Sequence, residues 1–108
     1  MDKIKYKNYA WGIFDNNMIW FNIKELSKIA CKNYTTVRLF IKNNYGISNS
    51  SKIRTVDYRD DDLIIRTDRY YSIDICFKVI EKYNREELNN FMIWSMSMLG
   101  DISKRNSN

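Results

Sequence analysis

The sequence contains no histidine and no proline, and only three glycines and two cysteines occur among its 108 residues. Without histidine, the Ser-His-Asp and Cys-His arrangements of nucleophilic catalysis are excluded. The three glycines are dispersed along the chain, so no glycine-rich loop is present to hold phosphates. Nor is there a Pro/Gly-rich linker between domains. These absences predict a protein that is not an enzyme.

The composition also argues against a metal centre. The two cysteines, Cys31 and Cys76, lie far apart in the chain, whereas a structural zinc site needs about four Cys or His ligands at close spacing. We expect two reduced thiols, since disulfides are unusual in the cytoplasm. The run Asp60-Asp61-Asp62 has the oxygen ligands of a divalent-cation site, but such a run is more often a solvated turn. The sequence therefore predicts neither a metal nor another cofactor.

Long apolar runs are absent as well. No segment approaches the ~20 apolar residues that span a bilayer, and the start, Met1-Asp2-Lys3-Ile4-Lys5, lacks the apolar stretch of a secretory signal. We therefore expect a cytoplasmic location and no membrane contact. The residues that are present, 44% apolar and 15% aromatic, suffice for one packed core. We expect one domain over residues 1–100 and a flexible tail over residues 101–108.

Positive charge is concentrated in the first half of the chain. Residues 1–56 contain ten Lys or Arg against three acids, a net charge of +7, whereas residues 57–108 contain eight Lys or Arg against ten acids, a net charge of −2. A basic half suggests a face presented to an anionic partner, of which nucleic acid is the commonest. The abundance of Asn, Ile, Lys and Tyr also suits an AT-rich genome, which by itself enriches lysine. Charge alone therefore does not decide the partner.

The apolar pattern near the N-terminus predicts a β-hairpin followed by a helix. Apolar runs over residues 9–14 and 18–21 flank an Asp/Asn turn, as in a hairpin. Asn22 is the expected N-cap of a helix over residues 23–30, and Glu25 is its expected capping-box partner.

After a three-residue gap, the pattern predicts a second helix over residues 34–44 and then a second hairpin. The hairpin strands are expected over residues 52–58 and 63–67, with Tyr70 and Tyr71 as an extension of the second strand. The helix has apolar residues at the spacing of one inward face: Val37, Phe40 and Ile41.

Two further helices are expected at the C-terminal end. Ser72 is the expected N-cap of a helix that ends at Tyr83. The run Asn84-Arg85-Glu86-Glu87 is typical of a helix start, because acids in the first turn favour the positive end of the helix dipole. The last helix is expected over residues 85–99, with Gly100 as its stop.

This order of elements is that of an α+β winged helix-turn-helix fold with an N-terminal β-hairpin, a wing hairpin and two C-terminal helices. Two amphipathic helices in another mixed fold are the alternative. In a winged helix-turn-helix, the second helix of the pair reads base edges in the major groove. Its candidate DNA-binding residues are Asn33, Tyr34, Thr35, Thr36, Arg38 and Lys42.

Basic side chains on the wing strands are expected to contact phosphates or the minor groove. The candidates are Lys52, Arg54, Arg66 and Arg69, because alternation along the strands can place several of them on one face. The acidic run at the hairpin tip would repel phosphate, so we expect the strands rather than the tip to make contact. The alternative is that these basic residues form only solvated faces.

Four segments spread over residues 12–99 resemble the N-terminal domain of the RhuM family, a group of virulence-associated and phage-related proteins presumed to bind DNA. They are Met18-Ile19-Trp20-Phe21-Asn22, the helix pair from Leu26 to Ile41, Tyr70-Tyr71-Ser72-Ile73-Asp74, and Phe91-Met92-Ile93-Trp94. The resemblance implies the fold and DNA binding. The chain departs from the family at Cys31, where glycine is usual, and at residues 84–87, which replace a basic loop.

The last predicted helix is apolar on more than one face. One face can cover the core and the other then needs a partner; a fully enclosed helix is the alternative. Two-fold homodimers are the commonest oligomers, and they match paired DNA half-sites. The candidate dimer residues are Ile93, Trp94, Met96 and Met98.

The sequence thus predicts a double-stranded DNA-binding protein of a mobile element, a phage or a conjugative plasmid. It would act as a transcriptional regulator or as an accessory protein at a transfer or partition site, with other proteins of the same element as further partners. A protein-binding module on the same scaffold, such as an antirepressor or a phage-encoded inhibitor, is the alternative, because a fold does not fix a function.

Overall fold

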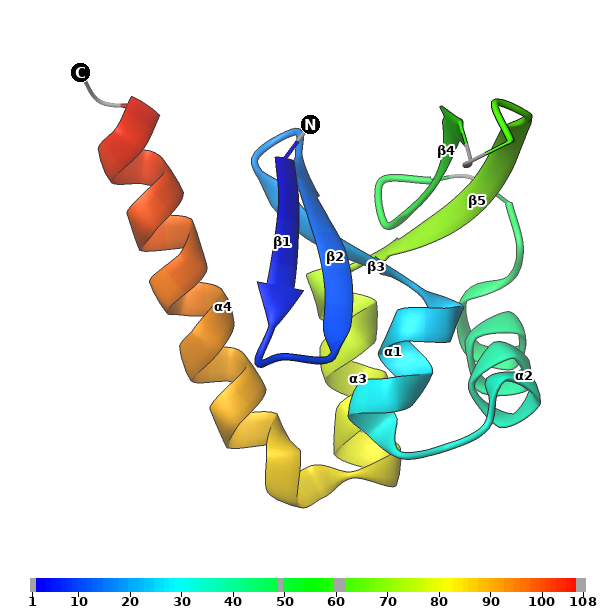
Figure 1. Cartoon of the computed structure of the whole chain (residues 1–108). Coiled ribbons are helices and arrows are strands. Elements are labelled where there is room, and N and C mark those ends of the chain that lie inside the picture. Colours follow the sequence, from blue (N-terminus) through cyan, green and yellow to red (C-terminus); the bar gives the residue numbers. More distant parts are fainter. Residues whose placement is uncertain (1, 49, 60–61, 107–108) are drawn as a thin grey trace.

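The computed structural model describes residues 2–48, 50–59 and 62–106, which form an α+β structure of one sheet and four helices (Figure 1). In chain order the elements are β1 (Asp2–Tyr6), β2 (Ala10–Asp15), β3 (Met18–Asn22), α1 (Ile23–Ala30), α2 (Tyr34–Tyr45), β4 (Ile53–Arg59), β5 (Ile65–Ser72), α3 (Ile73–Tyr83) and α4 (Arg85–Asn106). The two predicted hairpins and the four predicted helices are all present.

The strands form one antiparallel sheet in the order β1-β2-β3-β5-β4. Strand β3 pairs with β5, so that Phe21 lies opposite Tyr71. The N-terminal hairpin and the predicted wing therefore belong to the same sheet, which is larger than a wing hairpin alone. Strand β1 was not predicted from the sequence, although its alternation buries Ile4 and Tyr6 and exposes the lysines between and beside them.

The turn between β2 and β3 follows from its two asparagines. Asn16 and Asn17 both have positive φ, at 52° and 60°, which is the conformation of a type I′ turn between hairpin strands. Asparagine adopts it more readily than most residues. The local sequence thus fixes this hairpin.

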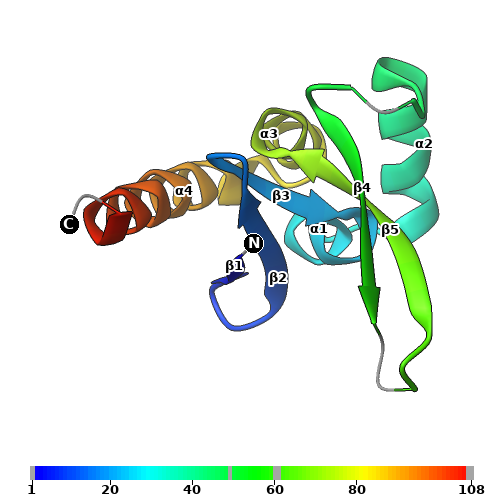
Figure 2. The same cartoon turned by 90° about the horizontal axis from the view of Figure 1, so that it is seen from above.

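All elements except the outer part of the β4–β5 hairpin contribute to one hydrophobic core. Phe21 of β3 and Phe91 of α4 lie at its centre with ring centroids 5.7 Å apart, and both are fully buried. Gly12 permits this packing, because a Cβ there would lie 2.8 Å from the Trp20 carbonyl oxygen. Helices α2 and α4 lie at opposite ends of the molecule, with α1 and α3 between them (Figures 1 and 2).

Helices α1 and α2 are joined by three residues, as predicted. Cys31, the first of them, has φ 55° and ψ 41°, the left-handed conformation that glycine adopts at least cost. Cysteine thus takes the left-handed position of this turn, where glycine is common. The two cysteines of the chain are free thiols, one exposed and one buried.

Helix α4 is longer than the sequence predicted. It continues through Gly100, which was expected to end it, as far as Asn106. A glycine inside a helix costs about 1 kcal/mol, whereas burying an isoleucine side chain gains about 1.5–3 kcal/mol, and Ile102 is only 3% exposed. Residues 101–106 are therefore helix, and residues 107–108 of the expected tail lie outside the described residues.

Within the part of the chain that the structure describes, no helix combines the length and the apolar character needed to cross a membrane.

Candidate nucleic-acid interface

Helix α2 presents a polar face to solvent. Val37 and Ile41 are buried and fix its inner side, and Phe40 is partly buried against the core, so the inward face is the predicted one. The helix contains no acidic residue. Four of the six predicted DNA-binding residues of the helix pair are exposed along its outer side: Tyr34, Thr35, Arg38 and Lys42.

The other two predicted residues hold the start of the helix. Asn33 is the N-cap, and its Oδ1 accepts a hydrogen bond from the backbone N–H of Thr36 at 2.8 Å. Thr36 is only partly exposed. Because no acid lies in the first turn, the positive end of the helix dipole is left uncompensated by the helix itself, which favours an anion nearby.

The predicted wing residues divide between the two faces of the β4–β5 ribbon. Directly opposite residues of an antiparallel pair share a face, and Tyr71 lies opposite the buried Ile53. Arg69, two residues before Tyr71, is therefore on that same inward face, whereas Arg54 and Arg66 are on the other. The four basic residues thus do not form a single stripe.

Arg54 is committed to contacts within the sheet. Its guanidinium forms an ion pair with Asp15 and lies 5.5 Å from the ring centroid of Trp20. These contacts join β4 to the β2–β3 hairpin, so a substitution of Arg54 acts on the sheet as well as on any ligand. Lys52, just before β4, is exposed. Asp60 and Asp61 of the acidic run lie outside the described residues.

A surface pocket of about 190 Å³ lies between α2 and β5. It brings together residues that the sequence assigned separately to the recognition helix and to the wing. Its charged lining consists of Arg38, Lys42 and Arg69 against one carboxylate, Asp68, a net charge of +2. The remaining lining is aromatic, apolar or glycine: Tyr34, Tyr71, Ile23, Ile41, Ile47 and Gly46.

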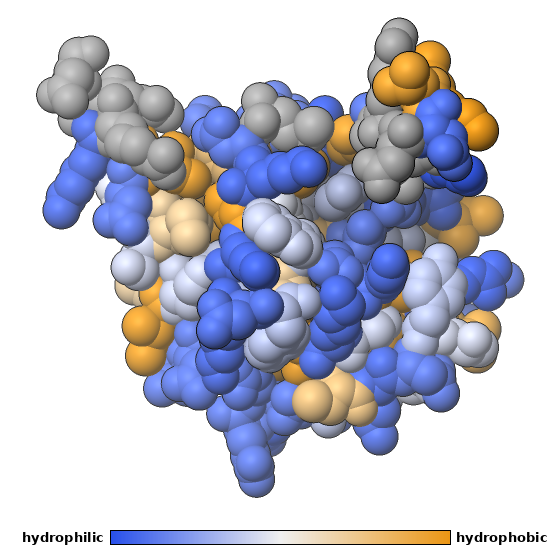
Figure 3. Space-filling model, viewed as in Figure 1, coloured by the Kyte–Doolittle hydropathy of each residue, from blue (hydrophilic) through white to orange (hydrophobic). Residues whose placement is uncertain are grey.

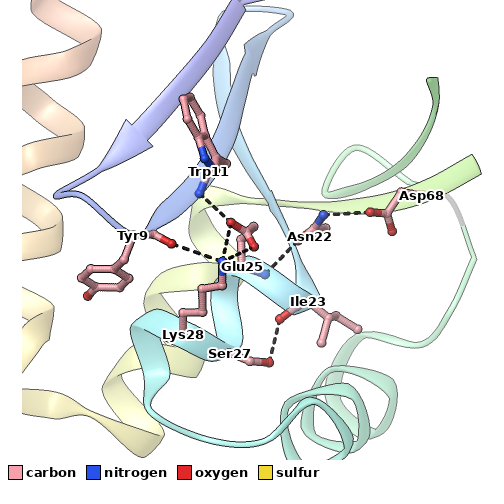
Figure 4. Close-up of polar contacts among 8 residues, drawn as sticks. All are labelled: Tyr9, Trp11, Asn22, Ile23, Glu25, Ser27, Lys28 and Asp68. Carbon is pink, nitrogen blue, oxygen red and sulfur yellow. Dashed lines mark hydrogen bonds and ion pairs between the residues drawn. The ribbon is translucent and has the colours of Figure 1, made fainter. Parts of the chain in front are cut away.

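The carboxylate in this pocket is already occupied by internal donors. Asp68 Oδ2 accepts from Asn22 Nδ2 at 2.8 Å, and Oδ1 accepts from the backbone N–H of Arg69 at 2.9 Å. Asn22 also caps α1, because its Oδ1 accepts from the backbone N–H of Glu25 at 2.9 Å. One asparagine thus ties the start of the helix pair to β5, as Figure 4 shows.

Glu25 fixes α1 against the sheet from the other side. The sequence predicts that the Glu25 carboxylate accepts a hydrogen bond from the backbone N–H of the N-cap residue, Asn22. Instead, one oxygen accepts from the backbone N–H of Trp11 at 2.9 Å, and the carboxylate pairs with Lys28. Lys28 Nζ also donates to the Tyr9 carbonyl oxygen at 3.3 Å (Figure 4). The helix pair is therefore held to β2 and β5 by side chains of α1 and by its cap.

One of the basic side chains that line the pocket has a buried hydrogen-bond donor without a partner. Arg69 Nε is buried and has no hydrogen-bond partner in the described structure. Burial raises the pKa of the neighbouring Tyr71 hydroxyl, and a side-chain hydrogen bond with Arg69 and the positive charge of Arg69 partly oppose this effect. The phenol therefore stays protonated beside the guanidinium.

Helix α4 divides the predicted dimer residues into two groups. Trp94 and Met98 are partly buried and pack against the core of their own chain, so they offer less surface to a partner than the other two predicted residues. Ile93 is 58% exposed and Met96 is 70% exposed, and the neighbouring Met92 is 41% exposed. We call Met92, Ile93 and Met96 the α4 patch.

A second apolar surface lies at the far end of the β4–β5 hairpin. Leu63, Ile64 and Ile65 are 73%, 52% and 64% exposed, and Figure 3 shows apolar residues gathered there beside polar ones. The sequence predicts a strand over residues 63–67, and this apolar surface was not predicted. Its signal in the sequence is the run of three consecutive apolar residues next to a turn.

Sequence reasoning also missed Asp68 and the second role of Asn22. The Asn22 cap signal was correct, but nothing local shows that its amide reaches a residue 46 positions away. Among the described residues, no group of three or more His, Cys, Asp or Glu side chains is placed to hold a metal ion.

No model of a known protein family, no curated protein and no solved structure matches the chain. The resemblance to the RhuM family therefore stays a prediction from the sequence.

Proposed function

We propose that the protein binds double-stranded DNA through α2 and the adjoining strand β5. The observation that carries the proposal is the convergence of Arg38 and Lys42 from α2 with Arg69 from β5 around one pocket. Cations at a helix–strand junction suit the phosphate backbone, and the exposed residues of α2 suit base edges. The acid-free surface of the helix supports the same proposal.

The helix pair with its three-residue turn, followed by an antiparallel ribbon, supports a winged helix-turn-helix arrangement in which α2 is the recognition helix. In the proposed mode, α2 enters the major groove and Arg38 contacts a base edge. Lys52 and Arg66 contact phosphates. Arg54 has a structural role through Asp15 and Trp20.

We place the protein in the cytoplasm, as part of a mobile element, a phage or a conjugative plasmid. It acts there as a transcriptional regulator or as an accessory protein at a transfer or partition site, and no catalysis is part of the proposal. The resemblance to the RhuM family and the AT-rich composition support this setting. Selection of bound duplexes from a random pool would identify the recognised sequence.

The direct test is titration of duplex DNA at two salt concentrations. Log affinity should fall with log salt at about 0.9 unit of slope per phosphate contact. Arg38→Ala should lose sequence preference, whereas Lys52→Ala should weaken binding to all sequences alike. If wild-type protein fails to bind any duplex at low salt more tightly than about 10⁻⁴ M, the weak end of non-specific binding, the DNA-binding proposal is wrong.

A protein-binding module is the second candidate, and the exposed Leu63, Ile64 and Ile65 favour it. Apolar side chains at a hairpin end are suited to a partner's apolar surface. Under this function, Leu63→Ser with Ile65→Ser abolishes capture of the partner and leaves DNA titrations unaffected. The salt titration above separates the two candidates, because only DNA binding depends steeply on salt.

A further inference from the structure

The pocket between α2 and β5 has more structure than a basic helix face needs. Arg38, Lys42 and Arg69 line it, and the single carboxylate, Asp68, already accepts hydrogen bonds from Asn22 and from the protein backbone. The lining therefore keeps an excess of two positive charges. A phosphate diester carries one negative charge, and a phosphomonoester carries about 1.5 to 2 at pH 7.

Arg69 has an unpaired hydrogen-bond donor that a ligand in the pocket can satisfy. Its Nε is buried and has no partner in the described part of the chain, and a buried donor without an acceptor is costly. A phosphate oxygen is the acceptor that guanidinium geometry matches best. Tyr71 and Ile41 provide apolar walls beside it, so the ligand needs a less polar part next to the charged group.

The size of the pocket limits what enters it. Its volume of about 190 Å³ is below the roughly 300–1,000 Å³ of sites for drug-sized ligands. A phosphate with part of a sugar fits this volume, and a larger ring system must lie outside. Tyr34, at the edge of the pocket and 54% exposed, offers an aromatic face on which a nucleobase stacks.

We propose that this pocket binds the phosphate group of a nucleotide, held by Lys42 and Arg69, with Arg38 toward the base and, for a free nucleotide, the Tyr34 ring against the base. The phosphate belongs either to a free nucleotide or to the backbone of bound DNA. The second source rests on the proposed DNA-binding function, whereas the first does not. A free nucleotide would occupy Arg38 and Lys42 and would therefore compete with DNA.

The first arm of the test uses adenosine 5′-monophosphate, with inorganic phosphate and adenosine as partial probes, titrated into the full chain and followed by amide NMR. If the free nucleotide is the source, the monophosphate shifts the signals of Tyr34, Arg38 and Arg69 saturably. Arg69→Gln then weakens its affinity by about tenfold or more, the loss of one charged hydrogen-bonding group. Lys78→Gln is the matched control, because it removes one positive charge from α3 and Lys78 lines no part of the pocket.

The second arm measures binding to a duplex of about 20 base pairs by fluorescence anisotropy over a salt series. If the backbone is the source, Arg69→Gln reduces the slope of log affinity against log salt by about one unit, and Lys78→Gln leaves it unchanged. If the free nucleotide is the source, the monophosphate displaces the duplex from wild-type protein and not from Arg69→Gln. Lys42→Gln, at an exposed position, replaces Arg69→Gln in both arms if circular dichroism shows that the latter is unfolded.

The results separate this proposal from the DNA-binding proposal. Nucleotide binding by a protein that binds no DNA retains the pocket and removes the proposed function. Pocket signals that do not move with the monophosphate or phosphate up to about 10 mM, together with no change of the DNA salt slope in either pocket variant, overturn the pocket proposal. Absence of both nucleotide and DNA binding overturns both.

Discussion

Asn22 connects the helix pair to β5 through two side-chain hydrogen bonds. Its Oδ1 caps α1, and its Nδ2 donates to Asp68. Removing an N-cap costs about 1 kcal/mol, and removing a hydrogen bond to a charged group costs about 1.5–3 kcal/mol. We expect Asn22→Ala to lower the free energy of unfolding by about 2.5–4 kcal/mol in a urea titration.

Asp68→Asn provides the comparison for this variant, because an amide nitrogen in place of Oδ2 removes the bond to Asn22, while Oδ1 still accepts from the Arg69 backbone N–H and the cap stays in place. It should lower the free energy of unfolding by about 1 kcal/mol less than Asn22→Ala does. Equal losses in the two variants would show that the cap contributes nothing to stability.

Cys31 has a left-handed backbone conformation that suits it poorly. A non-glycine residue in the left-handed region costs about 1–2 kcal/mol. Glycine avoids this cost, but its unfolded chain has more conformational freedom to lose on folding, and this offsets part of the gain in stability. We expect Cys31→Gly to raise the free energy of unfolding by about 0.5–1 kcal/mol in urea, with little loss from the exposed thiol. Cys31→Ala keeps the strain and should give no gain. A glycine variant no more stable than the alanine variant contradicts this account.

At the scale of elements, local signals predicted what local interactions determine. The Asn16–Asn17 turn, the Asn22 cap and the apolar spacing of α2 each specify their own element, and the structure has all three. The extent of α4 was not predictable in this way, because the burial of Ile102, which outweighs the cost of Gly100, arises only in the folded chain.

The contact between β1 and α4 is also long-range, and it makes the stability depend on pH. Glu87 of α4 accepts hydrogen bonds from Lys7 and from the buried Tyr6 hydroxyl, and these bonds hold the pKa of its carboxyl below the ordinary 4.5. A lowered pKa in the folded state stabilises the fold above pH 4.5, and this stabilisation is lost as pH falls through the folded-state pKa.

Urea midpoints measured from about pH 6 to about pH 3 should therefore fall more steeply for wild-type protein than for Glu87→Gln, which has no carboxylate to protonate. Glu86→Gln, at the exposed neighbouring position, is the control and should follow the wild-type curve. Parallel curves for wild type and Glu87→Gln would show that this contact does not contribute to the acid dependence.

At the scale of the whole molecule, the candidate site was predicted as two separate groups and exists as one pocket. The sequence identified Arg38 and Lys42 by their helix face and Arg69 by its strand. Their convergence depends on the pairing of β3 with β5 and on the bond from Asn22 to Asp68, which bring segments some 46 residues apart together. Such pairings leave no periodic signal in the sequence. The sequence therefore does not show that Arg69 lies on the inward face of the β4–β5 ribbon and Arg54 on the outward face.

The α4 patch bears on the assembly of the molecule. Helix α4 has 22 residues, a length of about 33 Å at 1.5 Å per residue, and it lies at the end of the molecule away from α2 (Figure 2). It exposes Met92, Ile93 and Met96. A two-fold contact between copies through this patch would bury it and leave both α2 helices free for paired half-sites. We expect wild-type protein to sediment as a dimer at micromolar concentration and Ile93→Lys with Met96→Lys to sediment as a monomer with an unchanged circular dichroism spectrum. Leu63→Lys with Ile65→Lys places the same charges on the other apolar surface, and this control variant should remain dimeric. A monomeric wild-type protein would show that α4 is not a dimer interface, and so would dissociation caused only by the hairpin variant.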